Sequence, residues 1–199
     1  MRVLAFSDLH LSRSRAAVLV EASAQADLVI GAGDFCNMRK GLDQAMGLLA
    51  GIAAPMVIVP GNAESHAELR AAAPDGVQVL HGSGCSVGGL RLFGLGYGVP
   101  VTPFGSWSCD LTEAQARDML AGCEAADILI THSPPKGIAD RTSGGVSVGS
   151  VAIHEAIGRI RPRLALCGHI HDSWGAEGMI GHSRVVNLGP TVNWFEVPE

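Results

Sequence analysis

Several features that define large protein classes are missing from the sequence. Its net charge is -5 and it has no block of basic residues, so we expect no general nucleic-acid-binding surface. Its five cysteines are irregularly spaced without a CxxC pair, which argues against a disulfide framework and favours reduced thiols in a cytoplasm. No apolar run approaches a membrane span, and Asp8 comes too early for a signal peptide. We therefore expect a cytoplasmic protein that is neither exported nor membrane-bound.

The length and composition predict a single domain over residues 1–199. A chain of 199 residues with 47% hydrophobic residues can bury a substantial core. The 26 glycines predict many tight turns, and we find no internal repeat or low-complexity tract. The stretch GYGVPVTPFGSWSCD, residues 96–110, is rich in Gly and Pro but aromatic, which indicates a packed surface loop.

Short apolar runs alternate along the chain with helix-like segments. The runs RVLAF, DLVIG, MVIVP, DILIT and RLALC are rich in Val, Ile and Leu and predict buried strands. Helical patterns are expected over residues 12–25, 40–53, 65–73, 112–125 and 150–161. Ser65 with Glu68, and Thr112 with Gln115, form capping boxes that support two of these helix starts.

Four further stretches are strand-like, and no helical pattern separates the first from the second or the third from the fourth. They read GVQVL, LRLFGLG, HSRVVNLG and VNWFEV. Strands that follow one another without a crossover helix usually pair antiparallel. We therefore predict a layered α/β fold with two sheets, in which an antiparallel portion joins a parallel one.

Each of the five buried runs is followed by polar residues that can bind a divalent cation. The carboxyl ends of parallel strands lie along one edge of a sheet, where ligands bind. Seven candidate metal ligands are therefore expected to converge: Asp8, His10, Asp34, Asn62, His132, His169 and His171.

These seven side chains exceed the needs of one ion, which usually takes four to six donors. We predict two ions with Asp34 as a bridge between them. Asp8, His10 and His171 would complete one site, and Asn62, His132 and His169 the other. Two cations about 3.5–4 Å apart can clamp a phosphoryl centre and lower the pKa of a bridging water to give a hydroxide nucleophile. Of the seven residues, we expect Asp34, Asn62 and His132 to act directly in catalysis.

Other residues near these blocks leave two interpretations open. Glu64 either orients a loop or ligand or is a surface charge, and His66 either begins a helix in solvent or turns toward the phosphate. Arg39 either binds a substrate phosphate or lies solvated on a helix. Cys36 and Cys167 adjoin ligand blocks, where a thiol usually acts as a small buried filler.

The blocks SDLH, AGDF, GNAE, THSPP and CGHIH occur in that order over residues 8–171. The chain thereby resembles the calcineurin-like metallophosphoesterase superfamily, whose blocks are D-x-H, G-D, G-N-H-[DE], a histidine after a strand, and G-H-x-H. The tails of the blocks are most similar to the small single-domain bacterial and archaeal members. The resemblance implies a four-layer αββα sandwich with two mixed β-sheets. It also implies two divalent ions, with Mn²⁺ as the first candidate and Fe, Zn²⁺, Ni²⁺ or Co²⁺ as others.

One position departs from the resemblance, because Ala63 stands where family members have a histidine near the leaving-group oxygen. A subset of small phosphodiesterases in the superfamily also lacks this imidazole. We therefore expect a binuclear metal-dependent phosphoesterase that acts on a small phosphate ester and slightly favours phosphodiesters. The alternative is a catalytically weak or inactive metal-binding scaffold of the same fold. The presence of all seven candidate ligands argues against this alternative.

Overall fold

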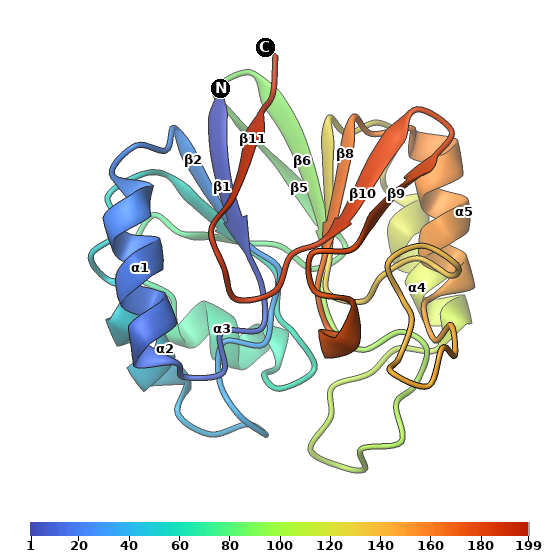
Figure 1. Cartoon of the computed structure of the whole chain (residues 1–199), viewed down its shortest axis with the longest axis horizontal. Coiled ribbons are helices and arrows are strands. Elements are labelled where there is room, and N and C mark those ends of the chain that lie inside the picture. The colour runs from blue at the N-terminus through green and yellow to red at the C-terminus, as the bar shows by residue number, and fades with distance from the viewer. Residues whose placement is uncertain (199) are drawn as a thin grey trace.

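The computed structural model describes residues 1–198 as two β-sheets packed face to face between helices (Figure 1). The first sheet has the order β11-β1-β2-β3-β4, with bounds Asn193–Glu196, Arg2–Phe6, Leu28–Gly31, Met56–Ile58 and Gln78–Val79. The second has the order β5-β6-β7-β8-β10-β9, with bounds Ser83–Val87, Leu90–Leu95, Ile128–Thr131, Leu164–Cys167, Ser183–Asn187 and Glu177–Ile180.

Helices cover the outer face of each sheet (Figure 1). On the first sheet they are α1 (Arg13–Ser23), α2 (Leu42–Leu49) and α3 (His66–Ala72). On the second they are α4 (Glu113–Ala121) and α5 (Val151–Ile160), and a short 3₁₀ helix, η1, covers His171–Ser173. None of the helices in residues 1–198 is long and apolar enough to cross a membrane.

The strands bury both faces, which explains why they appear in the sequence as continuous apolar runs. In β1, Val3 packs between the two sheets while Leu4 packs against the helices of the outer layer. In β7, Ile128 packs between the sheets and Leu129 against α4 and α5. Successive side chains of one strand thus fill two different layers of the core.

The predicted fold class is confirmed as a four-layer αββα arrangement with two mixed sheets. The five buried runs form β1, β2, β3, β7 and β8, and each of the five predicted helical segments contains a helix. The two capping boxes are present, with Ser65 accepting from the Glu68 amide and Thr112 accepting from the Gln115 amide.

The pairing of the later strands differs in part from the sequence prediction. The stretch GVQVL forms β4, which is parallel to β3 because α3 provides a crossover between them. The antiparallel pairs are instead β11 with β1, β5 with β6, and β9 with β10. The sequence does not predict β5 and β9, because SGCSV and EGMI are polar or Gly-containing edge strands with exposed residues.

The parallel strands direct their carboxyl ends toward the same side of both sheets, at the lower edge in Figure 1. The loops that follow β1, β2, β3, β7 and β8 therefore meet there. These loops carry the candidate metal ligands.

Candidate metal centre

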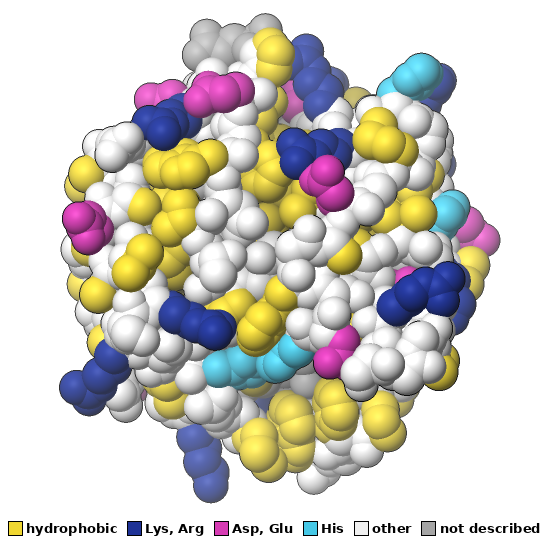
Figure 2. All heavy atoms as spheres, viewed as in Figure 1, with side chains coloured by type: hydrophobic (Ala, Val, Ile, Leu, Met, Phe, Trp, Pro, Cys, Tyr) yellow, Lys and Arg dark blue, Asp and Glu magenta, His cyan; other side chains and the backbone are white. Residues whose placement is uncertain are grey.

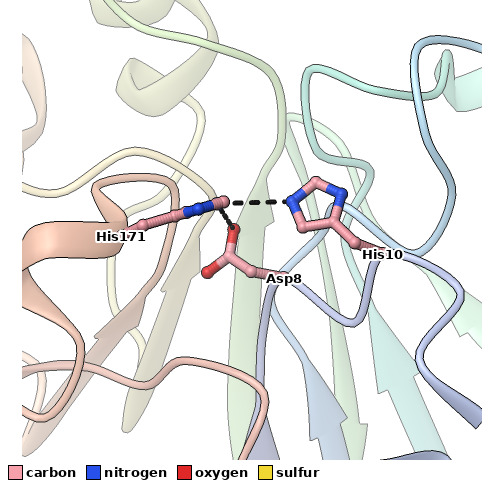
Figure 3. Close-up of side chains that lie close together, drawn as sticks. All are labelled: Asp8, His10 and His171. Carbon is pink, nitrogen blue, oxygen red and sulfur yellow. Dashed lines mark hydrogen bonds and ion pairs between the residues drawn. The ribbon is translucent and has the colours of Figure 1, made fainter.

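The structure brings six of the seven predicted ligands into two groups. Asp8, His10 and His171 form one group (Figure 3), and Asp34, His132 and His169 form the other. Within each group, one potential ligand atom from every residue lies within 4.8 Å of the others. We call the first set the outer group and the second the inner group. The names reflect exposure, because the His171 side chain is 50% exposed and that of His132 is 0% exposed.

Asp34 faces both groups with different oxygens. Its Oδ2 lies 3.5 Å from His10 Nε2, and its Oδ1 lies 3.4 Å from His132 Nε2. In the outer group, Asp8 Oδ1 lies 3.8 Å from His171 Nε2. Ligands of a tetrahedral ion with bonds of about 2.1 Å are separated by about 3.4 Å. These spacings fit ligands that share a cation, and Asp34 is positioned as a carboxylate between two of them.

Asn62 joins the inner group through its amide oxygen. Asn62 Oδ1 lies 3.1 Å from His132 Nε2, while its Nδ2 donates to Ser108 Oγ at 3.0 Å. Ser108 donates in turn to Asp110 Oδ1 at 2.9 Å. This network, which starts from the loop before α4, turns the amide oxygen toward the site and its NH₂ group away. The sequence patterns do not indicate Ser108 or Asp110, because neither belongs to a ligand block.

Backbone carbonyl groups determine which nitrogen of two histidines faces the site. His10 Nδ1 lies 3.0 Å from the Cys36 carbonyl oxygen, and His132 Nδ1 lies 2.8 Å from that of Ala32. A carbonyl oxygen can only accept, so Nδ1 carries the hydrogen in both rings. Nε2 is therefore the nitrogen of each ring that faces the site and that would bind a cation in its unprotonated form, as is usual for ligating histidines.

Asp8 is held by three donors besides any metal. Trp174 Nε1 donates to Asp8 Oδ2 at 3.0 Å, Ser7 Oγ donates to the same oxygen, and the His169 amide donates to Oδ1 at 3.1 Å. The Trp174 ring also lies 4.4 Å from the His171 ring, centroid to centroid. Trp174 thus contacts two members of the outer group. It follows the two histidines in the sequence, but no recognised spacing points to this role.

Almost the whole chain matches one known protein family. A model described as the calcineurin-like phosphoesterase superfamily domain matches residues 1–197. The chain belongs to this superfamily. The predicted resemblance is therefore confirmed.

Curated relatives cover a part of the chain. The human metallophosphoesterase domain-containing protein 1 is 36% identical over 126 residues, covering 59% of this chain and 36% of the relative. The Caenorhabditis elegans UPF0046 protein T07D4.2 is 30% identical over 106 residues, covering 49% and 26% respectively. The matched region thus spans about a third or less of the length of these relatives.

Solved structures share the fold at low sequence identity. The TT1561 protein of Thermus thermophilus has a TM-score of 0.74 at 17% identity, with 99% of each chain covered. A dimetal phosphatase from Danio rerio has a TM-score of 0.64 at 13% identity, covering 96% of this chain and 88% of the phosphatase. Both agree with the αββα arrangement of this superfamily member.

Glu64 ties together the loops that carry two of the candidate ligands. It is fully buried, and its Oε1 accepts from the Asp34 amide at 2.8 Å and from the Gly61 amide at 2.7 Å. Burial, with a further contribution from the neighbouring Asp34 carboxylate, raises the pKa of Glu64 to about 7. Of the two interpretations from the sequence, the structure supports the loop-orienting role.

Asp34 and His169 of the inner group have protonation states that suit a cation, whereas His132 would have to release a proton to bind one. Burial alone would raise the pKa of Asp34, but the facing His132 holds it well below its ordinary value. Burial would lower the pKa of His132, but Asp34 raises it to about 9 overall. Burial and then His132 lower the pKa of His169 to about 3, so that ring is neutral. Asp34 and His169 are thus in the forms that bind metals.

Four of the candidate ligands have a strained backbone. The φ angles are 53° for Asp8, 46° for His10, 58° for Asp34 and 69° for His169. Non-glycine residues avoid this left-handed region, at a cost of about 1–2 kcal/mol each, and such residues cluster at functional sites. Four of the seven candidate ligands therefore have a backbone conformation of the kind found at functional sites.

Two glycines of the ligand blocks allow close approach to the carboxylates. A Cβ atom at Gly61 would collide with Asp34 Oδ1, and one at Gly168 would collide with Ser7 Oγ. Either Cβ atom would lie closer to its neighbour than any real side chain can, so glycine is required at these positions. The GN and GH pairs of the sequence thus have a steric origin.

His66 and Arg39, for which the sequence leaves two interpretations open, do not reach the candidate ligands. The His66 ring lies 5.3 Å from the ring of His81 and belongs to neither group. Arg39 is paired with Glu68 of α3 through bonds of 2.8 and 2.7 Å, which direct its guanidinium toward that helix.

Three small side chains beside the ligand loops are buried. Ala63 is 2% exposed, and its amide donates to Asp34 Oδ1 at 2.8 Å. Cys36 and Cys167 are buried, as expected for fillers. These positions therefore support the loops without presenting a reactive group to the site.

Proposed function

We propose that the chain is a binuclear metal-dependent phosphoesterase that hydrolyses small phosphate esters, with phosphodiesters slightly favoured. The observation that carries the proposal is the Asp34 carboxylate, whose two oxygens face histidines of the outer and inner groups at 3.5 and 3.4 Å. A carboxylate in this arrangement is suited to bridge two ions. The shared fold of the Danio rerio dimetal phosphatase supports the same interpretation.

The donor set fits two hard or borderline divalent ions. Imidazole, carboxylate and amide oxygen ligands suit Mn²⁺, Fe, Zn²⁺, Ni²⁺ or Co²⁺, and we propose Mn²⁺ as the first candidate. The residues that would hold the ions are Asp8, His10, Asp34, Asn62, His132, His169 and His171. When bound, two such ions supply a water of lowered pKa and neutralise charge on the phosphate oxygens.

The protein contributes orientation and charge to this reaction. Asp34 is anionic, its backbone amide donates to Glu64, and its Oδ1 accepts from the Ala63 amide, so the carboxylate is held between the groups. His132 Nε2 and Asn62 Oδ1 lie 3.1 Å apart and face the same point. We therefore propose Asp34, Asn62 and His132 as the catalytic residues, because they lie between the two groups or within the inner one.

The proposed preference for diesters rests on Ala63 and on the resemblance to small phosphodiesterases that lack the same imidazole. Its methyl group cannot donate a proton to a departing oxygen, and His66, the nearest histidine along the sequence, is directed toward His81. General acid assistance is commonly worth about 10²–10⁴ in rate, and it matters most for strongly basic leaving groups. We infer that the enzyme is sensitive to the leaving group. We also propose a small-molecule substrate and a cytoplasmic location.

The test combines metal analysis with turnover. Protein loaded with Mn²⁺ should hold close to two ions per chain and should hydrolyse bis(p-nitrophenyl) phosphate faster than p-nitrophenyl phosphate. Two bound ions without turnover of either ester would favour the inactive metal-binding scaffold. Fewer than two ions under saturating metal would contradict the binuclear proposal.

A leaving-group series tests the inference drawn from Ala63. The logarithm of kcat/KM for a set of aryl and alkyl esters, plotted against leaving-group pKa, should fall steeply. A shallow slope would mean that another group donates the proton. That result would remove the argument for diesters while leaving the metal centre intact.

A further inference from the structure

A groove of about 660 Å³ opens beside the candidate metal centre. One wall is the loop after β6, from Val99 to Phe104, and the other is the loop between β7 and α5 with the first residue of α5. His169 and Ile170 form the end that meets the inner group. The volume lies within the range of small-molecule sites, about 300–1,000 Å³.

The surface of the groove is mainly apolar. Val101, Phe104 and Val151 line it and are 59%, 50% and 44% exposed. Figure 2 shows hydrophobic side chains gathered next to the band of histidines. Large apolar side chains exposed together in a hollow mark a binding site more often than an ordinary surface.

The two charged residues of the groove are already engaged elsewhere. Lys136 Nζ donates to the Ser147 carbonyl oxygen at 2.6 Å. The Glu113 carboxylate accepts from the amides of Val151 and Ala152 at 2.9 and 2.8 Å, at the start of α5. Glu113 is thus held by the start of α5, and Lys136 is an exposed cation at the rim that keeps further N–H donors, so the apolar side chains supply most of the contact surface of the groove.

The groove is continuous with the metal centre and its wall is preformed. The Phe104 ring lies 6.3 Å from the His169 ring and stacks on Trp107 at 5.6 Å. Asp110 fixes the same loop by accepting from the Thr102 amide at 3.1 Å and from Ser108 Oγ at 2.9 Å. Because Ser108 also holds the Asn62 amide, the groove wall and the inner group share one hydrogen-bond network.

We propose that this groove binds an apolar organic substituent of the substrate while its phosphate lies at the metal centre. The inference rests on the proposed phosphoesterase function and narrows it to esters that carry an aromatic or bulky aliphatic group. Esters of small polar alcohols would leave Val101, Phe104 and Val151 exposed to water. They should therefore bind more weakly than esters whose substituent removes this surface from water.

The test compares two non-hydrolysable ligands with the same charged headgroup. Methylphosphonate and 3-phenylpropylphosphonate are titrated calorimetrically into the metal-loaded protein. The phenylpropyl compound should bind at least about tenfold more tightly, because it buries more apolar area. Equal affinities would overturn the groove proposal and leave the metal centre untouched. If neither compound bound while bis(p-nitrophenyl) phosphate was turned over, the groove proposal would be overturned and the phosphoesterase function would stand; loss of both binding and turnover would overturn the two together.

Variants locate the difference in the groove. Phe104→Ala and Val101→Ser should each reduce the affinity ratio of the two ligands by about threefold or more, with little change for methylphosphonate. Val18→Ser is the matched control, since Val18 is 55% exposed on α1 and Val101 is 59% exposed. An unchanged ratio in both groove variants would contradict the proposal. A change of oligomeric state without a change of ratio would instead identify the groove as a contact between copies of the chain.

Discussion

The outer and inner groups of the metal centre use similar ligands in different surroundings. In the outer group, the side chains of His10 and His171 are 28% and 50% exposed. In the inner group, the side chains of His132 and Asp34 are 0% and 6% exposed. The inner ligands are therefore desolvated before any cation binds, whereas the outer histidines remain partly hydrated.

The supporting residues differ in the same way. The outer group is supported by Trp174, which follows η1 and donates to Asp8. Partial burial lowers the pKa of His171 in this group. The inner group is supported by the Ser108 and Asp110 network and by the Ala32 carbonyl. A preorganised site should hold its ion more tightly than an exposed one. The outer group should therefore be the first to lose metal during dialysis.

Asp34→Asn should have the strongest effect, because it removes the feature common to both groups. The amide keeps the shape of the side chain but loses the negative charge between the two sites. We expect kcat/KM to fall by roughly 10³ or more, and the metal content to fall below that of the wild type. Elemental analysis and steady-state kinetics measure both quantities. A variant that keeps two ions would contradict the bridging role.

His169→Ala and His171→Ala should remove different ions. His169 belongs to the inner group and His171 to the outer one. Each variant should lose about one ion, and the remaining ion should occupy the opposite group. Anomalous scattering from crystals of the two variants identifies which site is empty. Loss of the same peak in both would show that the division into groups is wrong.

Trp174→Phe should weaken the outer group alone. It removes the indole donor at 3.0 Å from Asp8 Oδ2 while retaining an aromatic ring beside His171. Loss of such a supporting bond typically costs about 10–100-fold in metal affinity, and we expect an effect of roughly 10-fold. Titration of the metal-free protein with Mn²⁺ measures it. Trp194→Phe is the control, because Trp194 packs under Arg2, outside both groups.

Ser108→Ala should weaken the inner group by a smaller amount. The variant frees the Asn62 amide to rotate, but His132, His169 and Asp34 keep their positions. We expect a loss of about threefold to tenfold in affinity for the inner ion. Ser86→Ala on β5 is the control, since Ser86 is exposed and lies outside the network. Equal losses at the two groups would mean that Ser108 acts on the fold as a whole.

The weakest effect is expected for Glu68→Gln, which lies outside both groups. Hydrogen bonding from Arg39 lowers the pKa of Glu68 to about 2, and the side chains of Arg39 and Glu68 are 34% and 43% exposed. Solvent screening limits the pair to about 0.5 kcal/mol of unfolding free energy. Because the folded-state pKa is lowered, this stability is present above the ordinary pKa near 4.5 and is lost as the pH falls toward 2.

Urea unfolding of the wild type and Glu68→Gln at pH 7 and pH 3.5 measures this pH dependence. The difference in unfolding free energy between the two proteins should shrink at the lower pH. Metal content should be the same in both proteins. If Glu68→Gln also lost metal, the metal losses of the other variants could no longer be assigned to the outer or the inner group.

Local sequence patterns are sufficient for the core strands and for the identity of the candidate ligands. Each of these patterns, an apolar run followed by a polar residue, involves only residues that are close together in the sequence. They are enough to place β1, β2, β3, β7 and β8 and to predict that their ends meet. The reason is that a parallel sheet aligns the carboxyl ends of its strands, whatever the loops contain.

The residues that support the ligands, and the pairing of the sheet edges, follow from long-range contacts instead. Trp174 meets Asp8 across 166 positions of the chain, and Ser108 meets Asn62 across 46. Such contacts depend on the paths of several loops at once, so no local pattern encodes them. The edge strands β5 and β9 are also not predicted locally, because their exposed sequences carry no strong apolar signal. The groove beside His169 likewise depends on the tertiary structure, because its two walls come from loops that are distant in sequence.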